Sequence, residues 1–224
     1  IARGKYLNTP LNTGVSFLKL KYLRNKYKHI RAIIPQNAMS AATMIACACD
    51  EIIMGKHSAL GPIDPQITFD SFTSPAQSIL DEFEMAKREI TINPALAAIW
   101  MKRIEKYPTG FIQICKNTIE LSKERLTLWL MTWMLKDIPD KETIANEVAQ
   151  WLGTTNIHKT HGKPIDINEL NHFKLNVTPL EMDQELQERV LSVFHATMAT
   201  HDFSQCVKII ENHNGLGHFI SAKR

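Results

Sequence analysis

The order of hydrophobic and polar positions in the first quarter of the chain predicts a strand, a buried helix and a second strand. Residues 30–34 form a short β-branched run that ends at Pro35, which suits a strand end because proline cannot donate to a ladder. Residues 41–49 are apolar on every helical face, which indicates a helix enclosed by protein. Residues 51–54 have the pattern of a second strand. This β-α-β order favours a parallel sheet with a right-handed crossover.

Helical periodicity dominates the rest of the chain. From Pro75 an apolar stripe centred on Phe83 continues to Ile90. Further helices are predicted at residues 16–26, 94–107, 111–136, 141–152 and 186–198. The segment 126–135 is apolar but too short and too closely flanked by charges to span a bilayer, so we expect it in the core or at an interface. Residues 56–70, interrupted by glycine and proline, are predicted to form a loop.

Length and charge restrict the class of protein. A chain of 224 residues with 44% hydrophobic residues can form one domain over residues 1–224, with a helical extension within about residues 93–224. The 26 basic and 23 acidic residues are too balanced to indicate nucleic-acid binding, and the basic cluster between Lys19 and Arg31 is expected to be the solvated face of the first helix. Because residue 1 is Ile, we expect the natural N-terminus upstream. We expect a cytoplasmic location, with membrane contact only through a segment absent from this chain.

The sequence contains no motif that indicates a bound cofactor or metal ion. The four cysteines form no CxxC, and Cys47 and Cys49 are expected to be reduced core residues, which favours a reducing compartment. No cysteine or carboxylate pattern completes a zinc set around His158, His161 and His172, so no metal is predicted. The nucleotide motifs GxxxxGK[ST] and GxGxxG are absent, and we expect no cofactor.

Ser40 is the candidate nucleophile because it stands at the start of the buried helix. A helix N-terminus presents unpaired N–H groups, and the N–H of Ala41 is a candidate oxyanion donor. Small side chains at Ala38, Ala41 and Ala42 would let a substrate backbone approach. Serine is also a favoured N-cap, so position alone favours a purely structural role for Ser40.

Lys87 is the candidate general base because it is the one charged residue within the apolar stripe of its helix. A desolvated amine has a lowered pKa and can accept a proton from a serine hydroxyl. Alternatively, Lys87 extends its ammonium into water or pairs with Glu84 at i,i+3. His57 and Lys56, nearer to Ser40 in sequence, are alternative bases.

A resemblance to a known family supports these roles. The run AMSAATMIACACDEIIMGKHSALGPIDPQ, followed by PAQSILDEFEMAKREI, HGKPI and the region 186–215, resembles the serine dehydrogenase proteinase family, relatives of signal peptide peptidase A in the ClpP/crotonase superfamily. The resemblance implies an α/β fold, a ClpP/crotonase-like superhelix of repeated β-β-α units with a largely helical C-terminal half. It also implies a homo-oligomer that acts on peptides or proteins, with Ser40 as nucleophile and Lys87 as base.

The sequence departs from the family pattern at the oxyanion loop. Thr9, Pro10, Leu11 and Asn12 stand where the family reads TPGG, so that Leu11 replaces a glycine expected to give the second oxyanion N–H. Three hypotheses follow: a serine endopeptidase with a Ser40/Lys87 dyad, a catalytically impaired oligomeric scaffold, and a crotonase-type enzyme acting on acyl-CoA. In ClpP the base is a histidine where this chain has Ile63 or Asp64, whereas His161 of HGKPI is expected to orient a site or contact a neighbouring subunit.

Overall fold

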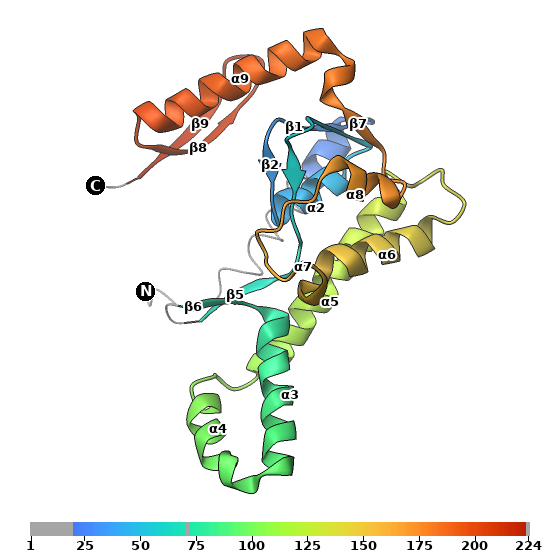
Figure 1. The fold of residues 1–224 in the computed structure, drawn as a ribbon. Coiled ribbons are helices and arrows are strands. Elements are labelled where there is room, and N and C mark those ends of the chain that lie inside the picture. Colours follow the sequence, from blue (N-terminus) through green and yellow to red (C-terminus); the bar gives the residue numbers. More distant parts are fainter. Residues whose placement is uncertain (1–19, 70–71, 223–224) are drawn as a thin grey trace. The chain divides into compact units, whose positions relative to one another are not determined.

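The computed structural model describes residues 20–69 and 72–222 (Figure 1). The contacts of these residues form two compact units, one within residues 20–178 and the other within residues 179–222. The predicted site residues that the structure describes belong to the first unit: Ser40, Ala41, Lys56, His57 and Lys87. Leu11, the predicted second oxyanion residue, lies outside the described residues. The prediction of a single domain over residues 1–224 stays a prediction.

The structure contains a three-stranded sheet with the strand order β1-β3-β7. β1 (Arg31–Ile34) pairs in parallel with β3 (Glu51–Met54), and α2 (Ala41–Cys47) lies between them in sequence. This confirms the predicted β-α-β order and its parallel pairing. The third strand, β7 (Val177–Pro179), has only three residues, which is too short to show a strand pattern in the sequence.

Two strands lie in the segment 56–70 that the sequence predicts to be a loop, and each pairs with a strand outside that segment. β2 (Asn37–Ala38) pairs in parallel with β4 (Ala59–Leu60), and β5 (Gln66–Phe69) pairs antiparallel with β6 (Phe72–Pro75). The loop prediction is therefore wrong for β4 and β5, because two-residue and four-residue strands depend on partners that periodicity does not reveal.

Helices form most of the remainder of the first unit. Helix α5 (Phe111–Thr132) runs beside both α6 (Lys141–Gly153) and α3 (Ala76–Ile92) (Figure 1). Residues 20–26 are helical, and the other helices are α3 (Ala76–Ile92), η1 (Pro94–Leu96), α4 (Ala97–Ile104), α5 (Phe111–Thr132), α6 (Lys141–Gly153), α7 (Thr155–His158) and α8 (Ile167–His172). The main core brings together apolar side chains of α2, the sheet, α5 and α6, among them Ile52, Trp129, Leu130 and Leu152. The prediction that residues 126–135 contribute to the core is confirmed.

The second unit contains η2 (Leu180–Met182), the long helix α9 (Gln184–Phe203) and a hairpin of β8 (Cys206–Glu211) and β9 (Gly217–Ser221). No residue of α9 is buried. The helix was predicted from its periodicity, whereas the hairpin was not predicted. Among the described residues of the whole chain, no helix has both the length and the apolar character that crossing a bilayer requires.

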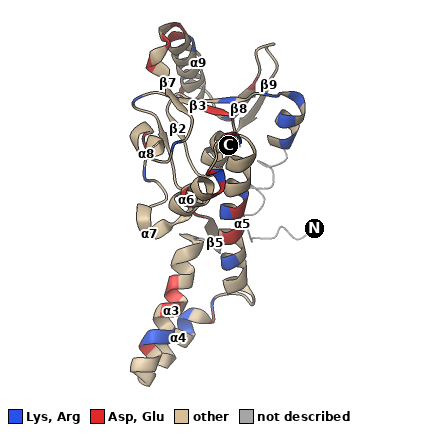
Figure 2. Ribbon diagram, turned by 90° about the vertical axis from the view of Figure 1, so that its right-hand side faces the viewer, with Lys and Arg blue, Asp and Glu red and all other residues tan. Residues whose placement is uncertain are grey.

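Charged residues of both signs lie along α3, whereas the charged residues of α4 are the basic Lys102 and Arg103 (Figure 2). Arg24 departs from the prediction that the basic cluster between Lys19 and Arg31 forms a solvated helix face. The guanidinium of Arg24 donates to Asp50 Oδ2 at 2.6 Å and to the carbonyl of Ala48 at 2.7 Å, and its Cζ lies 4.6 Å from the centroid of the Trp133 ring. Arg24 therefore ties the helix of residues 20–26 to the turn before β3. The prediction is wrong for this residue because that turn supplies the buried carboxylate of Asp50.

All four cysteines are free and buried. Burial raises the pKa of Cys47 to about 12 and the pKa of Cys49 to about 11. Thiols with such pKa values hold almost no thiolate at neutral pH, and the thiolate is the reactive form. The prediction that Cys47 and Cys49 are unpaired core residues is confirmed.

Candidate functional site

Ser40 lies in a backbone conformation that serine rarely adopts. Its φ is 52° and its ψ is −114°, and the N–H of Ala42 donates to the carbonyl of Met39 at 3.0 Å. These values place Ser40 at the first central position of a type II′ turn, a position that strongly favours glycine. The side chain of Ser40 makes no capping hydrogen bond to α2. Ser40 therefore stands at the N-cap position without capping α2 through its side chain, and its catalytic role stays a prediction.

Ala41 follows Ser40 as the first residue of α2 and is partly exposed. Its N–H makes no hydrogen bond to any described residue, so this donor is available to a ligand. Ala38, on the other side of Ser40, is buried. The predicted first oxyanion donor is thus unpaired in the part of the chain that the structure describes.

A compact set of contacts holds the Ser40 turn against the end of β4. Thr43 Oγ1 lies 2.7 Å from the carbonyl oxygen of Ala38 and 2.8 Å from that of Gly61, and it accepts the N–H of Gly61 at 3.0 Å. Gly61 also lies against Met39, since a Cβ on Gly61 would be 2.4 Å from Met39 Cε. The backbone after β4 is therefore in contact with the residue that precedes Ser40.

Three residues beyond Gly61, Asp64 forms a buried pair with a histidine from a distant part of the chain. His161 Nδ1 lies 2.7 Å from Asp64 Oδ1, and the two side chains are 29% and 2% exposed. The other carboxylate oxygen accepts from Gln66 Nε2 at 2.8 Å and from Thr155 Oγ1 at 3.3 Å. Sequence reasoning considered the two residues separately and missed the pair. Their places in GPIDPQ and HGKPI, two motifs of the same resemblance, were the available signal.

Lys87 is exposed on α3. Its side chain is 69% exposed, and Nζ lies 2.6 Å from Glu84 Oε1 in an i,i+3 ion pair. The alternative of a pair with Glu84 is confirmed, and the predicted desolvation of Lys87 is wrong within the single chain. The physical reason is angular: Ala86 occupies the buried face of α3, and the next residue is rotated about 100° away from it. A catalytic role of Lys87 stays a prediction.

Lys56 and His57, the alternative bases, are both exposed in the turn after β3. Their role as a base for Ser40 stays a prediction. His158 is buried, with Nε2 2.7 Å from the carbonyl oxygen of Trp151, so it is part of the packing. Within the described ranges, no three histidine, cysteine or acidic side chains gather as a metal site.

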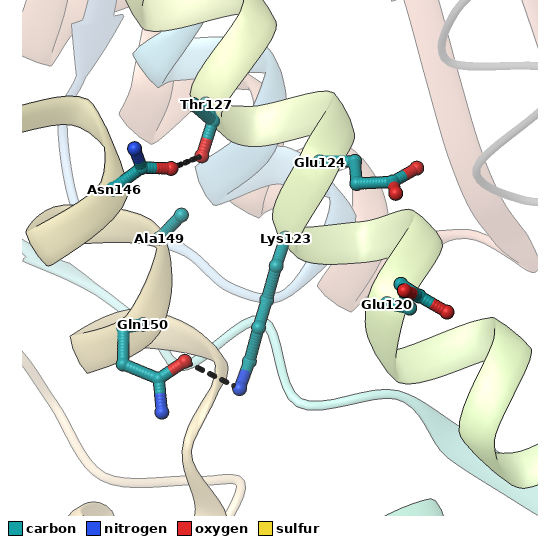
Figure 3. Close-up of a pocket in the computed structure, with 7 residues that line it drawn as sticks. All are labelled: Glu120, Lys123, Glu124, Thr127, Asn146, Ala149 and Gln150. Atoms are coloured by element: carbon teal, nitrogen blue, oxygen red, sulfur yellow. Dashed lines mark hydrogen bonds between the residues drawn. The ribbon is translucent and has the colours of Figure 1, made fainter. Parts of the chain in front are cut away.

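A surface pocket of about 360 Å³ lies between α5 and α6, as Figure 3 shows. Lys123 Nζ donates to Gln150 Oε1 at 2.7 Å, and burial lowers the pKa of Lys123. The carboxylates of Glu120 and Glu124 point away from Lys123 (Figure 3). The residues that line this pocket include none of the predicted site residues.

Comparison with known proteins places the chain in a family. Residues 18–211 match the family model of the ClpP-like SDH-type serine proteinases. Uncharacterized protein MJ1495 of Methanocaldococcus jannaschii is 30% identical over 145 residues, which cover 65% of this chain and 41% of that protein. Uncharacterized protein MJ0137 of the same organism is 42% identical over 64 residues, which cover 29% of this chain and 21% of that protein.

The chain thus spans less than half the length of these curated relatives. No solved structure gives a significant match. The mixed helices and parallel strands described above agree with the α/β fold that a ClpP-like family implies. Because the family match extends over most of the sequence, this chain belongs to the ClpP-like SDH-type serine proteinases.

Proposed function

We propose that this protein hydrolyses peptide bonds through an acyl-enzyme formed on Ser40. The observation that carries the proposal is the conformation of Ser40, a non-glycine residue at φ 52° whose hydroxyl makes no hydrogen bond to any described residue. Strained backbone conformations persist where the surrounding structure enforces them, and they cluster at active sites. A serine held at such a turn presents its hydroxyl for attack on a carbonyl carbon.

The oxyanion of the tetrahedral intermediate would accept the N–H of Ala41, which is unpaired among the described residues. The backbone near Leu11 is the proposed second donor. Lys87 is the base that the family resemblance implies. Because its ammonium is exposed and paired with Glu84, it can act only where a second copy of the chain encloses it, so this role requires a homo-oligomer.

The test is hydrolysis of an unstructured protein such as casein, together with labelling by a fluorophosphonate, which reacts with activated serines. We expect the Ser40→Ala variant to lose both signals. Ser78→Ala is the matched control, because Ser78 is an exposed serine on α3 that the proposal does not use. Hydrolysis that persists in Ser40→Ala contradicts the proposal. An inactive, unlabelled wild-type protein that retains acyl-CoA would favour the crotonase-type hypothesis instead.

A further inference from the structure

We infer that the surface pocket between α5 and α6 binds an organic monocarboxylate through Lys123 and the side-chain amides of Asn146 and Gln150 (Figure 3). None of the proposed catalytic residues lines this pocket, so the inference stands apart from the proposed function. The pocket has a volume of about 360 Å³, which is within the range of pockets that bind small molecules. It can therefore accept a small carboxylic acid or the end of a peptide chain.

Two hydrogen bonds join the helices along the pocket. Lys123 Nζ donates to Gln150 Oε1 at 2.7 Å, and Thr127 Oγ1 donates to Asn146 Oδ1 at 3.2 Å. Residues four positions apart on a helix lie on the same face, and this spacing separates the two partners on each helix. Both hydrogen bonds therefore face the same pocket, with Ala149 between them on α6 (Figure 3).

The hydrogen-bonding groups left open in this pocket are donors. An ammonium group can only donate, so the amide oxygen of Gln150 faces Lys123 and its NH₂ group is left unused. Asn146 also uses its amide oxygen, which accepts from Thr127. Neither amide NH₂ group donates to any residue that the structure describes. A ligand that offers acceptor oxygens matches these unused donors.

Lys123 also lacks a counter-charge. Its hydrogen-bond partner within the described ranges is a neutral amide, and the carboxylates of Glu120 and Glu124 point away from it (Figure 3). Its stem lies against α6, since a Cβ on Gly153 would be 3.0 Å from Lys123 Cε. Burial lowers the pKa of Lys123, because the ammonium is partly desolvated. A bound carboxylate supplies the missing charge.

The two glutamates select the charge of the ligand. Both are exposed and both line the pocket, so they repel a dianion about twice as strongly as a monoanion. A carboxylate carries one charge and has two oxygens in one plane, which can accept from Lys123 and from an amide NH₂ group at the same time. A monocarboxylate therefore fits this pocket better than phosphate does.

The test is a titration of the ¹⁵N-labelled full chain, followed by nuclear magnetic resonance through the side-chain NH₂ signals of Asn146 and Gln150. N-acetylglycine is the probe, and N-acetylglycinamide, which has a neutral amide in place of the carboxylate, is the matched control ligand. We expect a saturable shift of both signals with N-acetylglycine, no saturable shift with N-acetylglycinamide, and weaker binding of phosphate.

Acetate separates two sources of the carboxylate. Tighter binding of N-acetylglycine than of acetate identifies the end of a peptide chain as the ligand, whereas equal binding identifies a small free acid. Either result supports a carboxylate site.

Two variants at the pocket test the role of the charge. Lys123→Gln should weaken the binding of N-acetylglycine by about tenfold or more, because a charge-assisted hydrogen bond is lost. Gln150→Glu places a carboxylate beside Lys123, so it should abolish the shift of the Asn146 signal without lowering the melting temperature. Lys116→Gln is the matched control and should bind as the wild type does, because Lys116 is exposed on α5 and does not line the pocket.

The comparison of the two ligands needs only the wild-type protein, so it decides the question even where a variant fails to fold. The inference is overturned if N-acetylglycine and N-acetylglycinamide shift the signals equally, or if neither ligand shifts them. It is also overturned if a folded Lys123→Gln variant binds N-acetylglycine as tightly as the wild type, or if phosphate binds as tightly as N-acetylglycine.

Discussion

Ser40 carries an energetic cost that glycine would avoid. At φ 52° and ψ −114°, the Cβ of an L-residue is strained, whereas glycine adopts this region freely. We therefore expect the Ser40→Gly variant to be more stable than Ser40→Ala by about 1 kcal/mol, since alanine retains the strain. Urea unfolding of the two variants measures the difference. Equal unfolding free energies would mean that the turn relaxes when the hydroxyl is removed.

The ionisation of Asp50 makes the free energy of unfolding depend on pH. Burial by itself raises the pKa of Asp50, but the N–H of Ile30 and the guanidinium of Arg24 outweigh it and hold that pKa below its usual value. Since the folded pKa lies below the unfolded value of about 3.9, the stabilisation is complete above pH 4 and is lost as pH falls through the folded pKa.

Asp50→Asn therefore should destabilise the protein by about 3 kcal/mol at pH 7, because the charge of Arg24 loses its partner, and by less at pH 3, where part of the stabilisation by the ionised carboxylate is already lost. Urea unfolding at both pH values tests this. Glu185→Gln is the control, because its partner Arg189 and Glu185 itself are both largely exposed and little change is expected. An Asp50→Asn penalty of the same size at both pH values would contradict the assignment.

At the scale of elements, Gly61, which follows β4, contacts Met39, which precedes Ser40. We therefore expect a change in this packing to alter activity. A Cβ on Gly61 would lie 2.4 Å from Met39 Cε, so Gly61→Ala must displace the side chain next to Ser40. Because the displaced atom is the end of a flexible side chain, we expect a stability loss of only about 1 kcal/mol.

Activity should respond more strongly, falling by about tenfold or more, because small displacements of a catalytic group are costly. The matched control is Gly162→Ala, where the nearest atom to the added Cβ would be Thr160 Oγ1 at 3.9 Å. Casein hydrolysis and thermal melting of both variants provide the measurement. If Gly61→Ala retains full activity, the position of Met39 does not matter to Ser40.

At the scale of the whole molecule, the two units differ in how many of their side chains are buried. Residues of the first unit form the main core, whereas α9 has no buried residue and β9 is exposed along its whole length. Segments with few buried apolar contacts open at low free energy. Limited trypsin digestion should therefore cut between residues 183 and 222 before it cuts within residues 20–178. Mass spectrometry of the early fragments tests the order of cleavage, and an early cut within α5 or α6 would contradict it.

Much of the first unit was predictable because its signals are local. The apolar run of α2 and the flanking strands β1 and β3 follow from the periodicity of adjacent residues, which does not depend on distant partners. The nucleophile candidate followed from the same segment and from the family resemblance. The strands β4 and β7 were not predicted, because they have only two and three residues and depend on pairing with a partner strand.

The sequence by itself determined the β-α-β order, the helical character of the C-terminal half, the family and the place of Ser40. Tertiary structure alone decided the conformation of Ser40, the exposure of Lys87 and the pairing of Asp64 with His161. The physical reason is the same in each case. A helical wheel gives the direction of a side chain but not what covers it, and a hydrogen bond between residues 97 positions apart leaves no periodic trace in the chain.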